Sequence, residues 1–278
     1  MNAYHITADQ LERFAAHLRA GEKSAGTVEK YCRDVTAFAR YLEGRAVTQT
    51  AGADWKASLL CGGYAPVTVN SMLSALNAFF RFMRWDIHVR FVRIQRKLFR
   101  EERRELSRAE YGRLLTAAEP CPRIRLLLET ICSTGIRVSE VRYITVEAAR
   151  AGRTDIDLKG KVRTILLPDK LCRRLLRYAR KQKIASGEIF LTEGGRSMGR
   201  QRIWRAFKRL SAAAGVAPEK VFPHNLRHLF AVTFYRIYKD VVRLADLLGH
   251  SSVETTRLYL VTSGREHSRQ LNAMKLIC

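Results

Sequence analysis

The chain has 278 residues, 47% of them hydrophobic, which is ample for one large packed core or two smaller ones. It carries 50 Lys and Arg against 26 Asp and Glu, a formal net charge of +24 and a pI near 10.4. This balance favours a polyanionic partner and salt-sensitive binding, although a ribosome-associated or merely basic protein has the same composition. No apolar run reaches the about 18 residues of a membrane-spanning helix, and the first residues lack the pattern of a secretory signal.

The first 97 residues are predicted to form a helical bundle. A capping box fits Thr7-Ala8-Asp9-Gln10, a second helix is predicted from about Ala25 to Leu42, and a third begins after Pro66. Four or five helices in about 95 residues make a small bundle. Polar residues on these helices are either solvated positions or contacts to nucleic acid: Lys30, Arg33, Asn70, Ser71, Asn77, Arg81 and Arg84.

A charge-dense stretch separates this bundle from the rest of the chain. Residues 98–105 are rich in charge and poor in core residues, which favours a solvated linker, with a charged helical face as the alternative. The predicted organisation is therefore an N-terminal helical domain over 1–97, a linker over 98–105 and a C-terminal domain over 106–278.

The C-terminal domain is predicted to combine helices with a small sheet. A long apolar helix follows Pro120-Cys121-Pro122 and ends at Thr134-Gly135. Two strand-like runs, 153–158 and 162–167, flank a Lys-Gly-Lys turn and predict a hairpin, and Ile189-Phe190-Leu191 is a candidate for a short further strand. The expected fold class is α+β, mainly α with a small antiparallel β-sheet in the C-terminal domain.

Two helical stretches of this domain are strongly basic. Residues 170–183 hold seven Lys or Arg and no acid, and residues 201–210 interleave basic with apolar residues. Each stretch alone fits a solvated face. Two such stretches without compensating acids favour contact with DNA.

Three clusters in the second half carry groups suited to attacking a phosphodiester. They are Gly135–Glu140, His224–His228, and Leu247–His250 followed nine positions later by Tyr259. Arginines grip phosphate through bidentate forks, a histidine exchanges a proton, and a tyrosine hydroxyl serves as a nucleophile.

Each cluster alone also fits a structural interpretation. Arg137 and Glu140 stand one helical turn apart, so Glu140 either orients Arg137 or forms an ordinary ion pair with it. A lone His-x-x-Arg is usually structural, and Tyr259, between two leucines, fits a half-buried core position.

Taken in this order, the clusters strongly resemble the tyrosine recombinases, the family of phage integrases and Xer-type resolving enzymes. The resemblance spans about residues 7–262 and implies an N-terminal core-binding domain and a C-terminal catalytic domain. It implies that Tyr259 is the nucleophile and that Arg137 and Arg227 hold the non-bridging phosphate oxygens. It also implies that His224 accepts or shares the tyrosine proton and that His250 hydrogen-bonds to the scissile phosphate.

The family's last catalytic residue is a lysine in a hairpin turn, which protonates the departing 5′ oxygen. The turn in this chain is shorter than usual, and Lys159 and Lys161 both qualify. Lys161 is favoured because it stands at the start of the returning strand.

The resemblance implies a site-specific recombinase or integrase that cleaves and rejoins DNA through a 3′-phosphotyrosine and a four-way junction. The expected partners are double-stranded DNA with specific recombination sites and a homotetramer on two such sites, without a membrane, a metal or another cofactor. The expected location is the cytoplasm, in association with the nucleoid. Six cysteines without zinc spacing agree with a reducing compartment. The alternatives are a type IB topoisomerase and a catalytically silent DNA-binding regulator.

Overall fold

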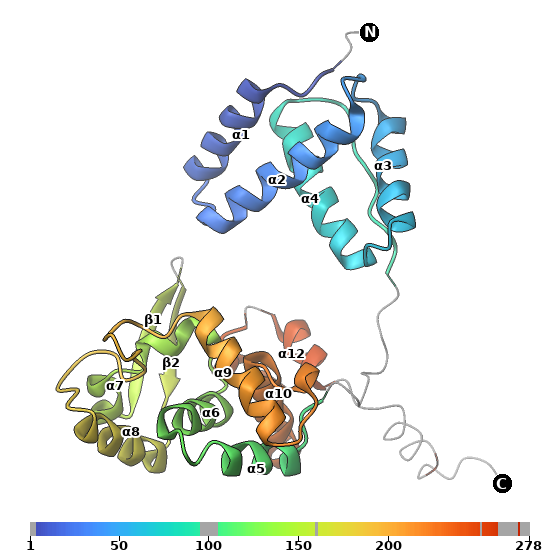
Figure 1. Cartoon of the computed structure of the whole chain (residues 1–278). Helices are drawn as coiled ribbons and strands as arrows, with labels where there is room; N and C mark the ends of the chain where they lie inside the picture. Colours follow the sequence, from blue (N-terminus) through green and yellow to red (C-terminus); the bar gives the residue numbers. More distant parts are fainter. Residues whose placement is uncertain (1–3, 95–104, 159–160, 251, 261–271, 273–278) are drawn as a thin grey trace. The chain divides into compact units, whose positions relative to one another are not determined.

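The computed structural model describes residues 4–94, 105–158, 161–250, 252–260 and 272. The chain divides into two compact units, Met1–Arg96 and Lys97–Cys278 (Figure 1). Apart from residue 105, the predicted linker lies outside the described residues, so its boundaries remain a prediction.

The first unit is a helical bundle. Its helices are α1 (Ala8–Ala20), α2 (Ala25–Leu42), α3 (Gln49–Cys61) and α4 (Pro66–Phe82). Thr7 and Gln10 form the predicted capping box of α1, and α4 starts at Pro66, whose missing N–H suits the first helical position. Helix α3, which the apolar pattern did not predict, packs Trp55 against Phe38 with ring centroids 5.0 Å apart.

Two of the polar residues considered as DNA contacts instead hold this bundle together. The Asn77 side chain donates to the Val89 carbonyl and accepts from the Val89 N–H, both at 2.9 Å. Asn70 makes the same pair of bonds with Val92, at 2.9 and 2.8 Å. Both amides therefore tie the segment that follows α4 back onto that helix, and contact of the bundle's polar residues with DNA stays a prediction. Lys30 is likewise engaged in an ion pair within α2.

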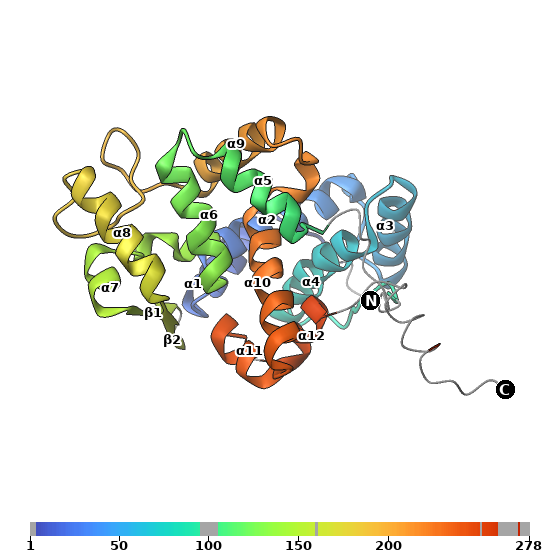
Figure 2. The same cartoon turned by 90° about the horizontal axis from the view of Figure 1, so that it is seen from below.

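The second unit arranges helices around α6. Its elements are α5 (Arg108–Ala117), α6 (Pro122–Thr134), η2 (Val138–Tyr143), α7 (Val146–Ala151), β1 (Arg153–Leu158), β2 (Lys161–Leu166), α8 (Asp169–Lys181), α9 (Arg200–Ala213), η3 (Pro218–Lys220), α10 (Pro223–Tyr238), α11 (Val241–Leu248) and α12 (Val253–Leu260). Helix α6, which has the predicted bounds, lies between α8 and α10 (Figures 1 and 2). Its buried Leu127, Leu128 and Ile131 place it in the core.

The predicted hairpin is present, with its second strand starting one residue earlier than expected. Strands β1 and β2 are antiparallel, and Leu158 pairs with Lys161 across a turn that lies outside the described residues. The prediction of a further strand at Ile189–Leu191 is wrong. Leu191 forms an isolated bridge with Ser197, and Glu188, just before this segment, forms another with Thr145. Within the described residues the sheet has two strands, which confirms a mainly helical fold with a small antiparallel sheet. None of the described helices has the length and apolar character needed to cross a bilayer.

Candidate functional site

A cavity of about 640 Å³ in the second unit brings the three predicted clusters together. Arg137 lines it from the start of η2, His224 and Arg227 from the first turns of α10, His250 from the turn after α11, and Thr255 from α12. Helix α9 completes the wall with Arg200, Trp204 and Lys208. Side chains distant in the sequence therefore share one basic concavity.

Arg137 is held by the carboxylate that the sequence placed one turn away. Its backbone N–H donates to Glu140 Oε2 at 2.8 Å, and its Nη1 donates to Oε1 at 2.9 Å. The Glu140 side chain is fully buried, whereas that of Arg137 is 42% exposed. The ion pair with Glu140 is thus the contact that orients Arg137. This ion pair leaves the Arg137 side chain accessible from the cavity.

A second arginine, Arg163, shares this carboxylate and was not predicted. Its Nη1 donates to Glu140 Oε2 at 2.8 Å, and its side chain is 11% exposed. Burial lowers the pKa of the Arg163 guanidinium, and Glu140 opposes that effect. Strand alternation could have indicated that Arg163 faces the core. It stands two residues before the buried Ile165 in β2 and therefore shares the inward face of that strand.

Three arginines converge on the carboxyl end of α11. Arg163 Nη2 donates to the Leu247 carbonyl at 2.6 Å, Arg227 Nη2 to the Leu248 carbonyl at 2.7 Å and Arg137 Nη2 to the Gly249 carbonyl at 3.3 Å. The last carbonyls of a helix have no partner within the helix and carry its partial negative charge. This end therefore gathers three cations that would otherwise repel one another.

Arg227 is the most deeply buried of the three, at 2% exposure. In addition to the Leu248 carbonyl, it donates to the carbonyl of Gly135, the residue that ends α6 in the left-handed conformation at φ 64°. A side chain at that position would also meet the Phe230 ring at 2.5 Å, so glycine is required there. Arg227 thus joins the ends of α6 and α11 from within α10.

His250 lies between Arg227 and a buried hydroxyl. Its Nε2 is 3.0 Å from Arg227 Nη2, and its Nδ1 is 2.8 Å from Thr256 Oγ1. A guanidinium only donates, so Nε2 accepts, and the proton of the neutral ring stands on Nδ1 and points to Thr256. Burial lowers the pKa of His250 to about 4, with further contributions from Arg227, Arg137, Arg163 and His224. The ring is therefore neutral above about pH 5 in the free protein.

The structure describes the remaining predicted residues to different extents. His224 is exposed, lines the cavity and stacks beside Phe222 with ring centroids 6.4 Å apart. Tyr259 belongs to α12, one turn after Thr255, and Lys161 is the first residue of β2. Lys159 lies outside the described residues.

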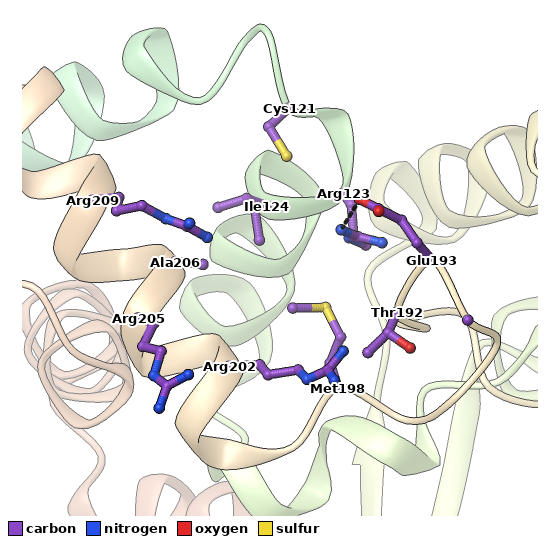
Figure 3. A pocket seen from close by; sticks show the side chains of 11 residues that line it. Cys121, Arg123, Ile124, Thr192, Glu193, Met198, Arg202, Arg205, Ala206 and Arg209 are labelled. Atoms are coloured by element: carbon purple, nitrogen blue, oxygen red, sulfur yellow. Dashed lines mark ion pairs between the residues drawn. The ribbon is translucent and has the colours of Figure 1, made fainter.

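The basic stripe on α9 divides between two faces. Figure 3 shows a second cavity, of about 370 Å³, lined by Arg202, Arg205 and Arg209 of α9 and by Arg123 of α6. Arg123 donates to the Leu191 carbonyl at 2.9 Å, and none of the candidate catalytic residues that the structure describes lines this cavity. The predicted stripe therefore does not form one continuous surface over the first cavity.

Models of known protein families match most of the chain. The phage integrase family model matches residues 104–265, and the model of the phage integrase N-terminal SAM-like domain matches residues 11–86. Similar curated proteins include tyrosine recombinase XerA of Pyrococcus furiosus, 28% identical over 91% of this chain and 90% of XerA. Tyrosine recombinase XerD of Xanthomonas campestris is 30% identical over 95% of this chain and 90% of XerD.

Solved structures share the fold. The Tn1549 transposon integrase in complex with transposon right end DNA superposes with a TM-score of 0.72 at 16% identity, covering 96% of this chain and 99% of that one. A lambda integrase tetramer bound to a Holliday junction gives a TM-score of 0.70 at 22% identity, over 90% of this chain and 76% of that one. These similarities cover both units of the chain.

Proposed function

Because the chain belongs to the phage integrase family and is a site-specific tyrosine recombinase, we propose that Tyr259 cleaves DNA by forming a 3′-phosphotyrosine link. The observation that carries this proposal is the cavity in which Arg137, His224, Arg227 and His250 converge. Thr255 lines the same cavity one helical turn before Tyr259, and residues four apart share a helix face. Covalent trapping of the protein on DNA, followed by sequencing of the trapped DNA, tests the chemistry and identifies the target together.

In the proposed step the Tyr259 oxygen attacks phosphorus and the 5′ oxygen leaves. His224 accepts the phenolic proton, since a phenol with a pKa near 10 is a weak nucleophile at neutral pH. Arg137 and Arg227 bind the non-bridging oxygens, where negative charge increases in the transition state. Their guanidiniums are already ordered by Glu140 and by the α11 carbonyls, so little reorganisation accompanies phosphate binding.

His250 is proposed to donate a hydrogen bond to the scissile phosphate. In the free protein its Nε2 accepts from Arg227, so donation from this nitrogen needs a second proton on the ring. A phosphate anion bound by Arg137 and Arg227 offsets the cations that lower the pKa of His250. Binding of DNA therefore favours the protonated, donating ring.

The phosphotyrosine link conserves the energy of the broken bond, so a 5′ hydroxyl from a partner duplex reverses the step on a new strand. Two rounds of exchange pass through a four-way junction. The lambda integrase tetramer on a Holliday junction supports a homotetramer on two DNA sites for this chain. Such an enzyme works where the chromosome lies, which we propose is the nucleoid region of the cytoplasm. The relatives reported above are recombinases and integrases, which disfavours a topoisomerase or a silent regulator.

We propose Lys161 as the general acid. It is the first residue of β2, where the chain returns from the hairpin turn. Lys161→Ala is expected to slow cleavage, and a substrate with a 5′-phosphorothiolate should restore it, because a thiolate leaves without protonation. Lys159→Ala is the matched control and should behave as a mild binding variant. The reverse pattern would assign the role to Lys159.

We propose that both units bind DNA, and salt dependence provides the measurement. Affinity for duplex DNA should fall log-linearly with salt concentration, with a slope of about 0.9 per phosphate contacted. Each unit has its own hydrophobic core, so separate 1–97 and 106–278 pieces should fold and each bind more weakly than the whole chain. The 106–278 piece should retain some cleavage. A nearly flat slope, or a 1–97 piece without affinity for DNA, would contradict the two-unit proposal.

A further inference from the structure

Arg163 lies where three segments of the proposed active site meet. From β2 it donates to Glu140, which holds Arg137, and to the Leu247 carbonyl in the last turn of α11. It also packs against Gly249, where an added Cβ would lie 2.3 Å from Arg163 Cδ. The turn that carries His250 therefore follows a helix end held by this guanidinium.

We propose that Arg163 is a positioning residue for DNA cleavage, which fixes Arg137 through Glu140 and the His250 turn through α11. This role rests on the proposed function, because it gives Arg163 no contact with DNA and acts only through residues placed in that reaction. It assigns to the hairpin strand a task separate from supplying the general-acid lysine.

Arg163 balances part of the charge on Glu140. This carboxylate is fully buried and is paired with two guanidiniums, at 2.9 Å from Arg137 and 2.8 Å from Arg163. A buried carboxylate that loses one cation is left with an uncompensated desolvation cost. Glu140 is then paired with Arg137 alone, which draws the Arg137 guanidinium toward Glu140 and out of the geometry in which it meets phosphate.

The shape of the Arg163 guanidinium also matters, because it contacts two segments at once. Arg163 uses Nη1 for Glu140 and Nη2 for Leu247, two acceptors on separate segments. The planar fork holds both at fixed angles, whereas a lysine is a single point of charge on a flexible stem. Lysine at this position keeps a positive charge near Glu140 but cannot hydrogen-bond to Glu140 and to the Leu247 carbonyl of α11 at the same time.

The test uses the full chain and a nicked suicide duplex that traps the covalent intermediate. Arg163→Ala is expected to lower the rate of adduct formation about 10²-fold, the size of effect that a displacement of about 1 Å produces. Affinity for the duplex should stay close to that of the wild type, and Arg163→Lys should recover part of the lost rate. The 5′-phosphorothiolate substrate should not restore either variant, because the defect lies at the phosphate and not at the leaving group.

Arg125→Ala is the matched control for general loss of stability. It removes another guanidinium of the same unit, which bonds to Glu119 at 2.7 Å and does not line the proposed active-site cavity. This variant should cleave at the wild-type rate. If Arg125→Ala and Arg163→Ala lose the same activity for the same fall in melting temperature, Arg163 is merely structural and the proposal fails.

A double substitution tests the contact between Arg163 and Gly249, and Arg163→Lys tests the fork if Arg163→Ala folds poorly. Gly249 has φ 62°, so Gly249→Ala adds backbone strain as well as the clash with Arg163. Gly249→Ala should reduce cleavage strongly in the wild type and in the Arg163→Lys background, which keeps Cδ, and much less in the Arg163→Ala background, where the clashing Cδ is absent. Equal effects in all backgrounds would overturn the coupling.

Two further results would overturn the role of Arg163. One is a wild-type rate in Arg163→Ala, and the other is full rescue of that variant by the phosphorothiolate, which would place its effect on the lysine. A wild-type protein that forms no adduct would instead overturn the proposed function, and the role of Arg163 with it.

Discussion

Tyr259→Phe is expected to bind duplex DNA with wild-type affinity and to form no covalent adduct. The substitution removes one oxygen and leaves the ring, so the nucleophile is lost with the smallest change in side-chain volume. The measurement is the yield of protein–DNA adduct on a nicked suicide substrate, resolved under denaturing conditions, beside a binding assay on the intact duplex.

Two other tyrosines serve as controls for this experiment. Tyr235 and Tyr238 belong to α10, where Tyr238 is 60% exposed and its ring contacts that of Phe234 at a tilt, with centroids 4.7 Å apart. Tyr235→Phe and Tyr238→Phe should form the adduct in normal yield. An adduct of normal yield from Tyr259→Phe would reject the assignment, and peptide mapping of the linked residue would then identify the true nucleophile.

Local signals predicted the helix boundaries because a cap acts within one turn of the chain. Thr7 and Gln10 form the predicted capping box of α1, and Gly135 ends α6 as expected. Asn70 and Asn77 show the limit of such patterns. Their amides bind backbone 22 and 12 residues away, which the polarity of a helix face does not reveal.

Some residues of the candidate site could likewise be predicted from local sequence motifs, whereas others depend on tertiary packing. Motif order indicated Arg137, His224, Arg227 and His250, and all four line one cavity. Arg163 was missed because its acceptor on α11 lies 84 residues away, and strand alternation gives only its inward face. The convergence of three arginines on α11 likewise depends on tertiary packing. The roles of these residues in cleavage remain predictions.

Arg227→Ala is expected to impair both folding and cleavage. The guanidinium is 2% exposed and donates to the carbonyls of Gly135 and Leu248, so its removal leaves two buried acceptors without this donor. Each buried polar group without a partner costs about 1–3 kcal/mol, so two predict a loss of about 2–6 kcal/mol in the free energy of unfolding. Chemical denaturation measures this loss. Arg205→Ala, an exposed arginine of the same unit, should change the free energy of unfolding by less than about 0.5 kcal/mol.

Arg227→Lys separates the charge from the fork. A lysine keeps a cation near Leu248 but cannot hold both carbonyls and the His250 ring together, so stability should recover more than activity does. Adduct formation should remain about 10²–10³-fold below the wild type, the effect of losing one preorganised donor at a developing oxyanion. Arg227 Nη2 also faces His250 Nε2, so Arg227→Ala removes a neighbouring cation and should raise the pKa of His250, whereas Arg227→Lys keeps a cation there and should raise it less. If Arg227→Lys cleaves at nearly the wild-type rate, a point charge suffices at this position, and the buried arginine serves to join α6 and α11.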